Sequence, residues 1–273
     1  MPPTSTAPIT ANNATTATTA ARLSRLLSDT GLIFHRSLRQ TVRSRLGLVF
    51  GLLMPLLYLV LFGPLLQDLP LGGSGDAWQT LVPGLLMQLG LFSAAFCGFA
   101  ILIEKQLGIV ERMRVTPVSR LALLLGRTLK DVLQLFLQSL VLVLAAVAMG
   151  LRTSVLGAVI GFLFTALLTI SLASLSYALA MRVDSPQEFA PVVNTVNMPA
   201  MLLSGLLLPM SLAPRWLDAV SHFVPFRYLV DAVRAAFVGD YWSGAVGVGA
   251  LVAVVFAAVS VTVGTRVFTR AGA

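Results

Sequence analysis

Residues 132–181 read VLQLFLQSLVLVLAAVAMGLRTSVLGAVIGFLFTALLTISLASLSYALAM, and this stretch decides the fold. Two apolar runs, 132–151 and 155–181, are separated only by the tripeptide RTS. Each run is long enough to cross a hydrocarbon layer of about 30 Å as an α-helix, the form in which one segment pairs its own backbone polar groups in lipid. The stretch therefore predicts a tight hairpin of two membrane-spanning helices.

Four further apolar runs extend the same pattern along the chain. They lie at about residues 46–66, 81–103, 189–208 and 244–268. Each is again long enough to span a membrane. Together with the hairpin, these runs predict an all-α membrane protein with six transmembrane helices in a single transmembrane domain, residues 22–270.

The composition excludes a soluble globular protein. Of the 273 residues, 57% are hydrophobic and 11% are charged, and the mean hydropathy is +0.88, whereas a soluble domain carries about 25% charged residues. The chain has one cysteine, Cys97, and two histidines, His35 and His222. We therefore expect no internal disulfide and no metal site.

The formal net charge of +8 is better explained by membrane topology than by nucleic-acid binding. Most of the 19 Lys and Arg residues lie in connections that share one side of the membrane if the N-terminus is inside. The first connection on the other side, residues 67–79, holds Asp68 and Asp76 and no basic residue. Because basic residues favour the inner side, we expect a multi-pass protein of the cell membrane with both termini cytoplasmic, in contact with lipid and without a nucleic-acid partner.

The chain begins with an uncharged polar tail that leads into a basic amphipathic segment. Residues 1–21 are mostly Thr, Ala, Pro and Asn, a composition that cannot bury a core and predicts a disordered cytosolic tail. In residues 22–45, large apolar residues alternate with six arginines at helical spacing. This pattern predicts a helix on the membrane surface, the alternative being an ordinary basic flank before the first span.

The sequence carries no motif for catalysis or nucleotide binding. Lys105 and Lys130 are the only lysines, and neither follows a glycine, so the Gly-Lys of a phosphate-binding loop is missing. No predicted span carries a charged residue at its centre, which weakens the case for an ion-coupled secondary transporter. We therefore expect no catalytic residue and no cofactor bound by this chain.

The most charged connection between two predicted spans is EKQLGIVERMRVTPVSR, residues 104–120. Apolar residues recur in it at helical spacing, and Pro117 ends the predicted helix because proline disfavours helical geometry at the residue before it. The stretch is longer than a connection needs, so we expect a helix on the inner surface that docks a partner; the alternative is a plain connector. The candidate docking residues are Glu104, Lys105, Gly108, Glu111, Arg112, Arg114, Thr116 and Pro117.

The segment 209–243, between the fifth and sixth runs, is too hydrophobic for a free loop and is punctuated by prolines. It predicts two short helices, at about 215–223 and 226–237, in a re-entrant or interfacial hairpin on the outer side with aromatic residues at the interface. Asp231 can pair with a basic residue on either side of it along the helix, which would chiefly stabilise that helix. The candidate residues of the hairpin are Pro209, Pro214, Trp216, Pro225, Phe226, Arg227, Tyr228 and Arg234.

The fifth run contains polar and small residues that need an explanation in a membrane. Asn194 and Asn197 lie in its inner half, and Ser204 and Gly205 lie further out. An asparagine in hydrocarbon needs a hydrogen-bond partner, so these residues should face protein or a cavity. A substrate path, a contact across a dimer and plain helix packing all remain open.

Two of these stretches together resemble the ABC-2 type exporter permeases. The first is EKQLGIVERMRVTPV, residues 104–118, which resembles the cytosolic loop of that family. The second is similar to the family's other hallmark region and comprises LSG at 203–205, Pro209, PRWL at 214–217, PFRY at 225–228 and Arg234. The resemblance covers about residues 22–270 and is nearest to permeases of the daunorubicin-resistance type.

The resemblance implies six spans, an N-terminal interfacial helix and a cytosolic coupling helix at residues 104–117. It implies two permease copies, as a homodimer or a heterodimer, paired with two separate ABC ATPase subunits that bind ATP and Mg. The chain would then be the transmembrane subunit of an exporter that moves a hydrophobic or amphiphilic substrate, a drug or antibiotic foremost. The alternatives are a lipid or glycan exporter of the same architecture, an ATPase-independent secondary transporter, and a non-transport membrane assembly factor.

Overall fold

The structure, a computed structural model, describes residues 30–35, 38–39, 45–66, 76–108, 120–206, 210 and 213–270. In these ranges the chain is helical, with turns and short connections and without a β-strand. The helices are α2 (Arg45–Leu66), α3 (Ala77–Ala95), α4 (Cys97–Gln106), α6 (Arg120–Ala148), α7 (Val155–Arg182), α8 (Pro186–Leu203), α9 (Arg215–Ser221), α10 (Pro225–Val238) and α11 (Gly244–Arg270). The all-α prediction is confirmed for the part of the chain that is described.

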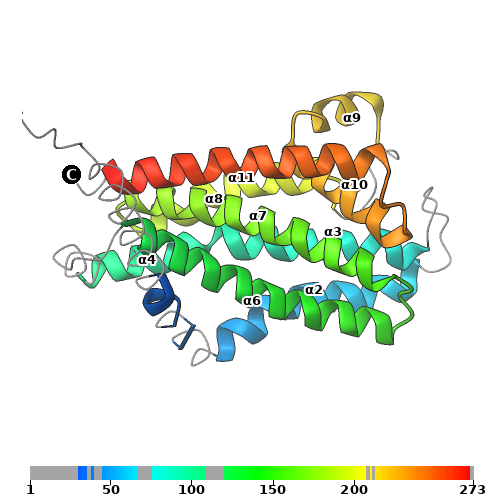
Figure 1. Cartoon of the computed structure of the whole chain (residues 1–273), viewed down its shortest axis with the longest axis horizontal. Helices are drawn as coiled ribbons and strands as arrows, with labels where there is room; N and C mark the ends of the chain where they lie inside the picture. Colours follow the sequence, from blue (N-terminus) through cyan, green and yellow to red (C-terminus); the bar gives the residue numbers. More distant parts are fainter. Residues whose placement is uncertain are drawn as a thin grey trace, which may run out of the picture.

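The long helices lie side by side in one bundle, with α7 at its centre (Figure 1). Helix α7 contacts α3, α4, α6, α10 and α11. Small residues on α7 let its neighbours approach closely, since a β-carbon on Gly157 would lie 2.4 Å from the Ala236 carbonyl oxygen of α10. We call the end of the bundle where α4 finishes and α6 begins the α4 end, and the opposite end the α10 end.

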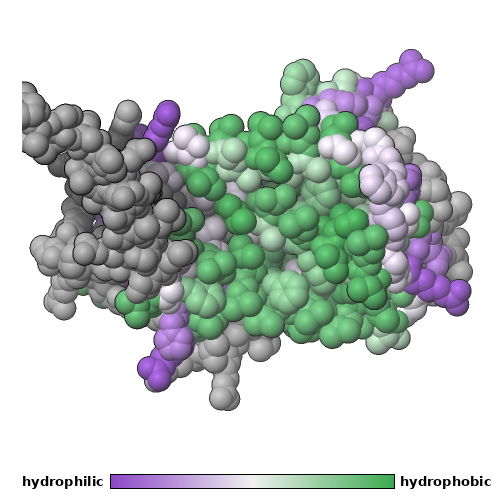
Figure 2. Space-filling view, in the orientation of Figure 1, coloured by the Kyte–Doolittle hydropathy of each residue, from purple (hydrophilic) through white to green (hydrophobic). Residues whose placement is uncertain are grey.

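Four helical segments among the described residues are long and apolar enough to cross a membrane. They are Ala77–Gln106, Leu125–Ala148, Val155–Arg182 and Gly244–Val267. Figure 2 shows a broad apolar band over the middle of one face, with hydrophilic residues towards both ends. The chain is therefore a multi-pass membrane protein. The first and fifth predicted spans correspond to helices α2 and α8. Neither helix is among these four segments, and the apolar part of α2 is the shorter stretch Gly51–Leu65. The six-span topology therefore stays a prediction.

The second predicted span is two helices rather than one. Helix α3 ends at Ala95 and α4 begins at Cys97, with Phe96 between them. Ser176 of α7 bridges the break, because its hydroxyl donates to the Ala95 carbonyl at 2.5 Å and accepts from the Gly98 amide at 2.8 Å. A side chain from another helix thus serves backbone groups that an unbroken helix would pair by itself.

The third helix begins about three turns before its predicted start at residue 132. Helix α6 extends back to Arg120 and includes Arg127, Lys130 and Asp131, charges that end the apolar run in the sequence. The helix continues through them because each has an ion-pair partner inside the bundle. Hydropathy alone therefore placed this helix start too late.

Part of the predicted interfacial helix packs against the bundle. Residues 30–35 and 38–39 are helical, whereas the tail 1–21 and the remainder of 22–44 lie outside the described residues. A β-carbon on Gly126 of α6 would come within 2.9 Å of the Ile33 side chain, so the two segments are in close contact. The membrane-surface position of this segment stays a prediction.

The contact between α10 and α11 depends on a glycine, which gives a first prediction. A β-carbon on Gly249 would lie 2.5 Å from the Ala232 side chain and 2.7 Å from the Tyr228 carbonyl oxygen. Gly249→Ala should therefore lower stability by about 1–3 kcal/mol through overpacking. Thermal unfolding in detergent measures this change. Gly247→Ala on the same helix meets nothing within 4 Å and gains helix propensity, so it should keep or raise the midpoint; equal effects of the two variants would contradict the packing.

Candidate functional site

The structure describes the beginning of the predicted coupling stretch. Glu104 and Lys105 form the last turn of α4, and Gly108 ends the helix with φ +69°, a conformation that glycine adopts without strain. Helix α4, the second of the two helices in the second predicted span, therefore continues into this stretch without a break. The candidate docking residues that lie outside the described part of the chain are Glu111, Arg112, Arg114, Thr116 and Pro117.

A buried ion pair ties the end of α4 to α6. The Arg127 guanidinium donates to the Glu104 carboxylate, and the two side chains are 11% and 16% exposed. Charges this buried are tolerated when they are paired, whereas one left alone would be strongly destabilising. Glu104 is thus engaged within the chain rather than presented as a free polar face. Its role in docking stays a prediction.

Lys105 makes a second, more exposed link at the same end. Its ammonium group donates to the Asp184 carboxylate at 2.8 Å and to the Val183 carbonyl at 3.2 Å, just after α7. The hydrogen bond and the charge of Lys105 lower the pKa of Asp184. Because the Asp184 side chain is 88% exposed, solvent screens this pair and it contributes little to stability.

A third set of contacts joins α6 to α7, one helical turn beyond Arg127 along α6. Asp131, which is 5% exposed, pairs with Lys130 and accepts a hydrogen bond from the hydroxyl of Tyr177. Tyr177 is 2% exposed and belongs to α7. We call Glu104, Arg127, Lys130, Asp131 and Tyr177 the α4-end network. It connects α4, α6 and α7 next to the predicted docking stretch.

The predicted hairpin helices are present at the α10 end, and their bounds agree with the prediction to within two residues. Arg227 of α10 reaches α9, with its Nη1 atom 2.9 Å from the backbone oxygen and 2.7 Å from the carboxylate of Asp218. Its Nε atom lies 3.7 Å from Asp231, the predicted i,i+4 pair. Burial raises the pKa of Asp231 despite its basic neighbours. The two predicted pairs of Asp231 are confirmed as intrahelical contacts.

Arg234 brings the hairpin and the end of α8 together. Its guanidinium donates to the carbonyls of Gly205 at 2.7 Å, Leu206 at 3.3 Å and Thr80 of α3 at 3.3 Å. Gly205 has φ +70° and follows the last turn of α8. Burial lowers the pKa of Arg234 to about 10. The predicted site residues Gly205 and Arg234 are therefore neighbours, although 29 positions separate them in the sequence.

Other predicted hairpin residues divide between core and surface. Phe226 is buried and stacks edge-on against Phe256 of α11, with ring centroids 5.5 Å apart. Tyr228 donates through its hydroxyl to the His222 carbonyl at 2.9 Å. Trp216 is 68% exposed on α9. Pro214 precedes α9 and Pro225 begins α10, whereas Pro209 lies outside the described residues.

The polar residues of the fifth run do not form one site. On α8, Asn194 is exposed, while Asn197 is 5% exposed and its Nδ2 atom lacks a partner among the described residues. Ser204 is buried and donates to the Met201 carbonyl of its own helix at 2.9 Å. Their roles, whether in a substrate path, a dimer contact or plain helix packing, stay predictions.

A cavity that the sequence reasoning missed lies between α2, α3, α6 and α8. Its volume is about 470 Å³, and its lining includes Gln88, Gln134 and Gln138 together with Tyr58 and Met201. The signal in the sequence was present, since amide side chains inside apolar runs need partners. Only the packed structure brings the three glutamines, which come from two helices, to one cavity.

Comparison with known proteins now identifies the family. The ABC-2 type transporter family matches residues 29–238 of this chain. The chain belongs to the ABC-2 type transporter family. Members of this family are membrane permease components of ABC transporters and normally work with an ABC ATPase subunit.

Relatives of this permease agree with the family. A protein of Cyanophora paradoxa named as transport permease ycf38 is 26% identical over 216 residues, covering 77% of this chain and 74% of the relative. A permease of Mycobacterium tuberculosis named for doxorubicin resistance, DrrC, is 23% identical over 223 residues, covering 81% and 80%. The daunorubicin resistance ABC transporter permease protein DrrB1 of Streptomyces coeruleorubidus is 23% identical over 194 residues, covering 70% and 69%.

The α4-end network of the permease gives a second prediction. Arg127→Met leaves the buried Glu104 carboxylate without its partner and should lower stability by about 3–5 kcal/mol. Adding Glu104→Gln should restore part of the loss, because the unpaired charge is removed. Thermal unfolding in detergent measures both steps. Asp184→Asn, which breaks the exposed pair, is the control and should change little.

The end of α8 gives a third prediction. Arg234→Met leaves the carbonyls of Gly205 and Leu206 without their donor and should lower stability by about 1–3 kcal/mol. Arg215→Met, at an exposed position of α9, is the control. Thermal unfolding of the two variants is compared in one detergent. If they unfold together, Arg234 does not hold α8 to α10.

Proposed function

We propose that this permease is the transmembrane subunit of an ATP-driven exporter. In the proposed complex two permease copies, identical in the simplest case, pair with two ABC ATPase subunits in the cell membrane, with both permease termini cytoplasmic. The substrate is a hydrophobic or amphiphilic molecule, a drug or antibiotic foremost. The single observation that carries this proposal is the family match over residues 29–238. The names of two relatives, which mention doxorubicin and daunorubicin resistance, support the substrate class.

ATP hydrolysis is assigned to the partner. The chain has two lysines, Lys105 and Lys130, and no Gly-Lys pair, whereas a phosphate-binding loop needs a lysine that reaches the phosphates. ATP and Mg would therefore be held by the ATPase subunits. The permease contributes the path through the membrane and the contacts that move it.

The α4-end network supports a route for coupling. We place the docking surface for the ATPase on residues 104–117. A displacement of this stretch acts directly on Glu104, which is paired with Arg127 of α6. From α6 the Asp131–Tyr177 hydrogen bond continues to α7, the central helix of the bundle. Because buried ion pairs resist separation, movement at the docking surface would be passed on to α6 and α7 rather than lost in the connection.

Co-purification tests the proposal. The tagged full-length chain is expressed with its neighbouring reading frames, purified in mild detergent and assayed for ATPase activity with and without hydrophobic drugs, neutral and cationic. A stoichiometric partner with a phosphate-binding loop and drug-responsive ATPase activity is the expected result. A chain that purifies alone under all conditions would reject the exporter in favour of a secondary transporter, and a response to lipid or glycan but not drug would change the substrate class.

The docking stretch gives a fourth prediction. Glu111→Ala or Gly108→Leu should abolish ATP-driven transport while leaving membrane insertion intact, because each change alters the docking surface and not the spans. Drug efflux from cells and the amount of protein in the membrane fraction are measured together. Gly247→Ala, in open space on α11, is the control. Full transport by both docking variants would show that docking lies elsewhere.

A further inference from the structure

The cavity between α2, α3, α6 and α8 has two chemically different sides. Gln88 of α3 and Gln134 and Gln138 of α6 supply amides, whereas Tyr58 of α2, Phe92 of α3 and Met201 of α8 supply aromatic and apolar surface. Its volume of about 470 Å³ is within the range of drug-sized binding sites. A cavity that combines apolar surface with a few amides is typical of a site for an amphiphilic molecule.

Gln88 has hydrogen-bonding capacity that the described part of the chain leaves unused. The side chain is 7% exposed, and its Oε1 atom is buried without a partner among the described residues. An unsatisfied buried carbonyl is costly and rare in native structures, so it calls for an explanation. The terminal torsion of glutamine is soft, which lets the amide turn its oxygen towards a molecule in the cavity. A hydrogen-bond donor on a ligand would satisfy this oxygen.

The lining also restricts the charge of the ligand. Among the residues that the structure describes, none that lines the cavity carries a formal charge: they are Gly51, Met54, Pro55, Tyr58, Gln88, Leu89, Phe92, Ser93, Gln134, Gln138 and Met201. An ion placed there would lose its hydration without gaining a counter-ion. The cavity is therefore suited to a neutral molecule.

We infer that this cavity binds a neutral, largely apolar molecule that donates an N–H or O–H hydrogen bond to the side-chain oxygen of Gln88. Calling this molecule a transported substrate rests on the proposed function; the binding itself does not. Aromatic parts of the ligand lie against Tyr58 and Phe92, and the donor points towards the glutamines of α3 and α6.

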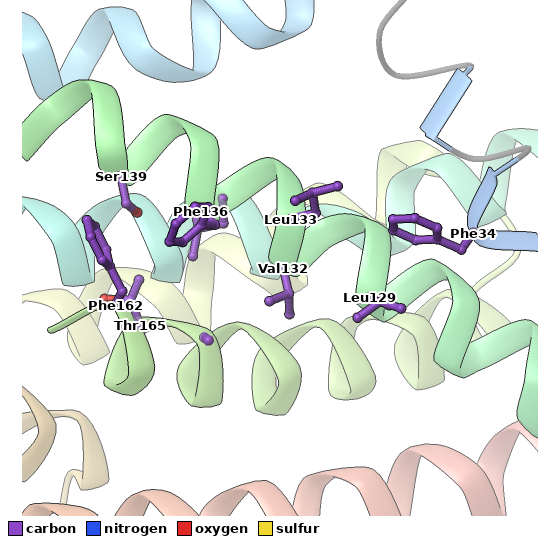
Figure 3. A pocket seen from close by; sticks show the side chains of 10 residues that line it. Phe34, Leu129, Val132, Leu133, Phe136, Ser139, Phe162 and Thr165 are labelled. Atoms are coloured by element: carbon purple, nitrogen blue, oxygen red, sulfur yellow. The ribbon is translucent and has the colours of Figure 1, made fainter. Parts of the chain in front are cut away.

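A second cavity serves as an internal comparison. It measures about 280 Å³ and lies between α6 and α7, with Phe34 at one end and Phe136 and Phe162 at the other (Figure 3). Its polar groups are hydroxyls, and that of Thr165 already donates to the Gly161 carbonyl of its own helix at 2.7 Å. Helical hydroxyls commonly bond in this way. The hydroxyl of Ser139, by contrast, is buried in this cavity without a partner among the described residues, so this smaller cavity offers a competing acceptor.

Two matched photoreactive probes test the inference. Para-hydroxybenzophenone is neutral and has one O–H donor, whereas para-methoxybenzophenone keeps the rings and the ketone but has no donor. The full-length protein in lipid nanodiscs is irradiated with each probe, and labelled residues are identified by peptide mass spectrometry. Met54 and Met201, both on the cavity wall, should react with the hydroxyl probe. The methoxy probe should label them roughly fivefold less, as expected from the loss of one hydrogen bond to a buried group.

Variants provide the second arm of the test. Gln88→Leu keeps the approximate size of the side chain and should reduce labelling by the hydroxyl probe to the level of the methoxy probe. Ser139→Ala, in the second cavity, is the control and should leave labelling at Met54 and Met201 unchanged. If Gln88→Leu fails to fold, the comparison of the two probes on the unaltered protein decides alone.

Two outcomes would overturn the inference. Equal labelling by both probes would show that no donor is recognised, and labelling centred on Phe136 and Phe162 would place the site in the second cavity. ATPase co-purification is measured on the same preparation without either probe. If the ATPase complex is intact but labelling is not selective, the binding cavity is rejected and the proposed function is retained. If labelling is selective but no ATPase co-purifies, the binding cavity is retained and the exporter is rejected.

Discussion

A helix bundle in lipid has to pair its own backbone polar groups, and the places where this chain interrupts a helix determine how the rest is arranged. At the break between α3 and α4, the hydroxyl of Ser176 serves a carbonyl and an amide that flank Phe96. At the end of α8, the guanidinium of Arg234 serves the carbonyls of Gly205 and Leu206. Each of these side chains comes from another helix. The breaks therefore fix α3 and α4 against α7, and α8 against α10.

The α4 end follows the same logic with charges. Arg127 and Asp131 lie on α6 where the helix is already enclosed by its neighbours, so each needs a partner; besides Lys130, the neighbour of Asp131 on the same helix, two partners come from other helices. Glu104 supplies one from α4, and Tyr177 supplies the other from α7. Polar contacts thus hold the helices together at this end, as apolar packing holds them together along the middle of the bundle. These pairs therefore join the three helices beside the predicted docking stretch.

The sequence was sufficient where the signal is local. Helices α9 and α10 and the pairs of Asp231 depend on proline positions and on spacings of three and four residues. The sequence was insufficient where partners are distant. The contact of Gly98 with Ser176 joins residues 78 positions apart, and the cavity at Gln88 depends on how α3 and α6 are rotated about their own axes. Hydropathy records neither rotation nor pairing. For the same reason it treated the charges before residue 132 as the end of a helix that in fact continues through them.

Helix α6 contributes residues to both the α4-end network and the cavity. Arg127, Asp131, Gln134 and Gln138 are spaced four, three and four residues apart, which places them along one face of the helix. The first two belong to the α4-end network and the last two line the cavity. A shift or rotation of α6 therefore alters both regions together, since a packed helix moves as a rigid element. If a partner pushes on the end of α4, the ion pair to Arg127 carries the displacement into α6, and the glutamines of the cavity move with it. The amides that receive a ligand and the charges that respond to docking would then be coupled through a single helix.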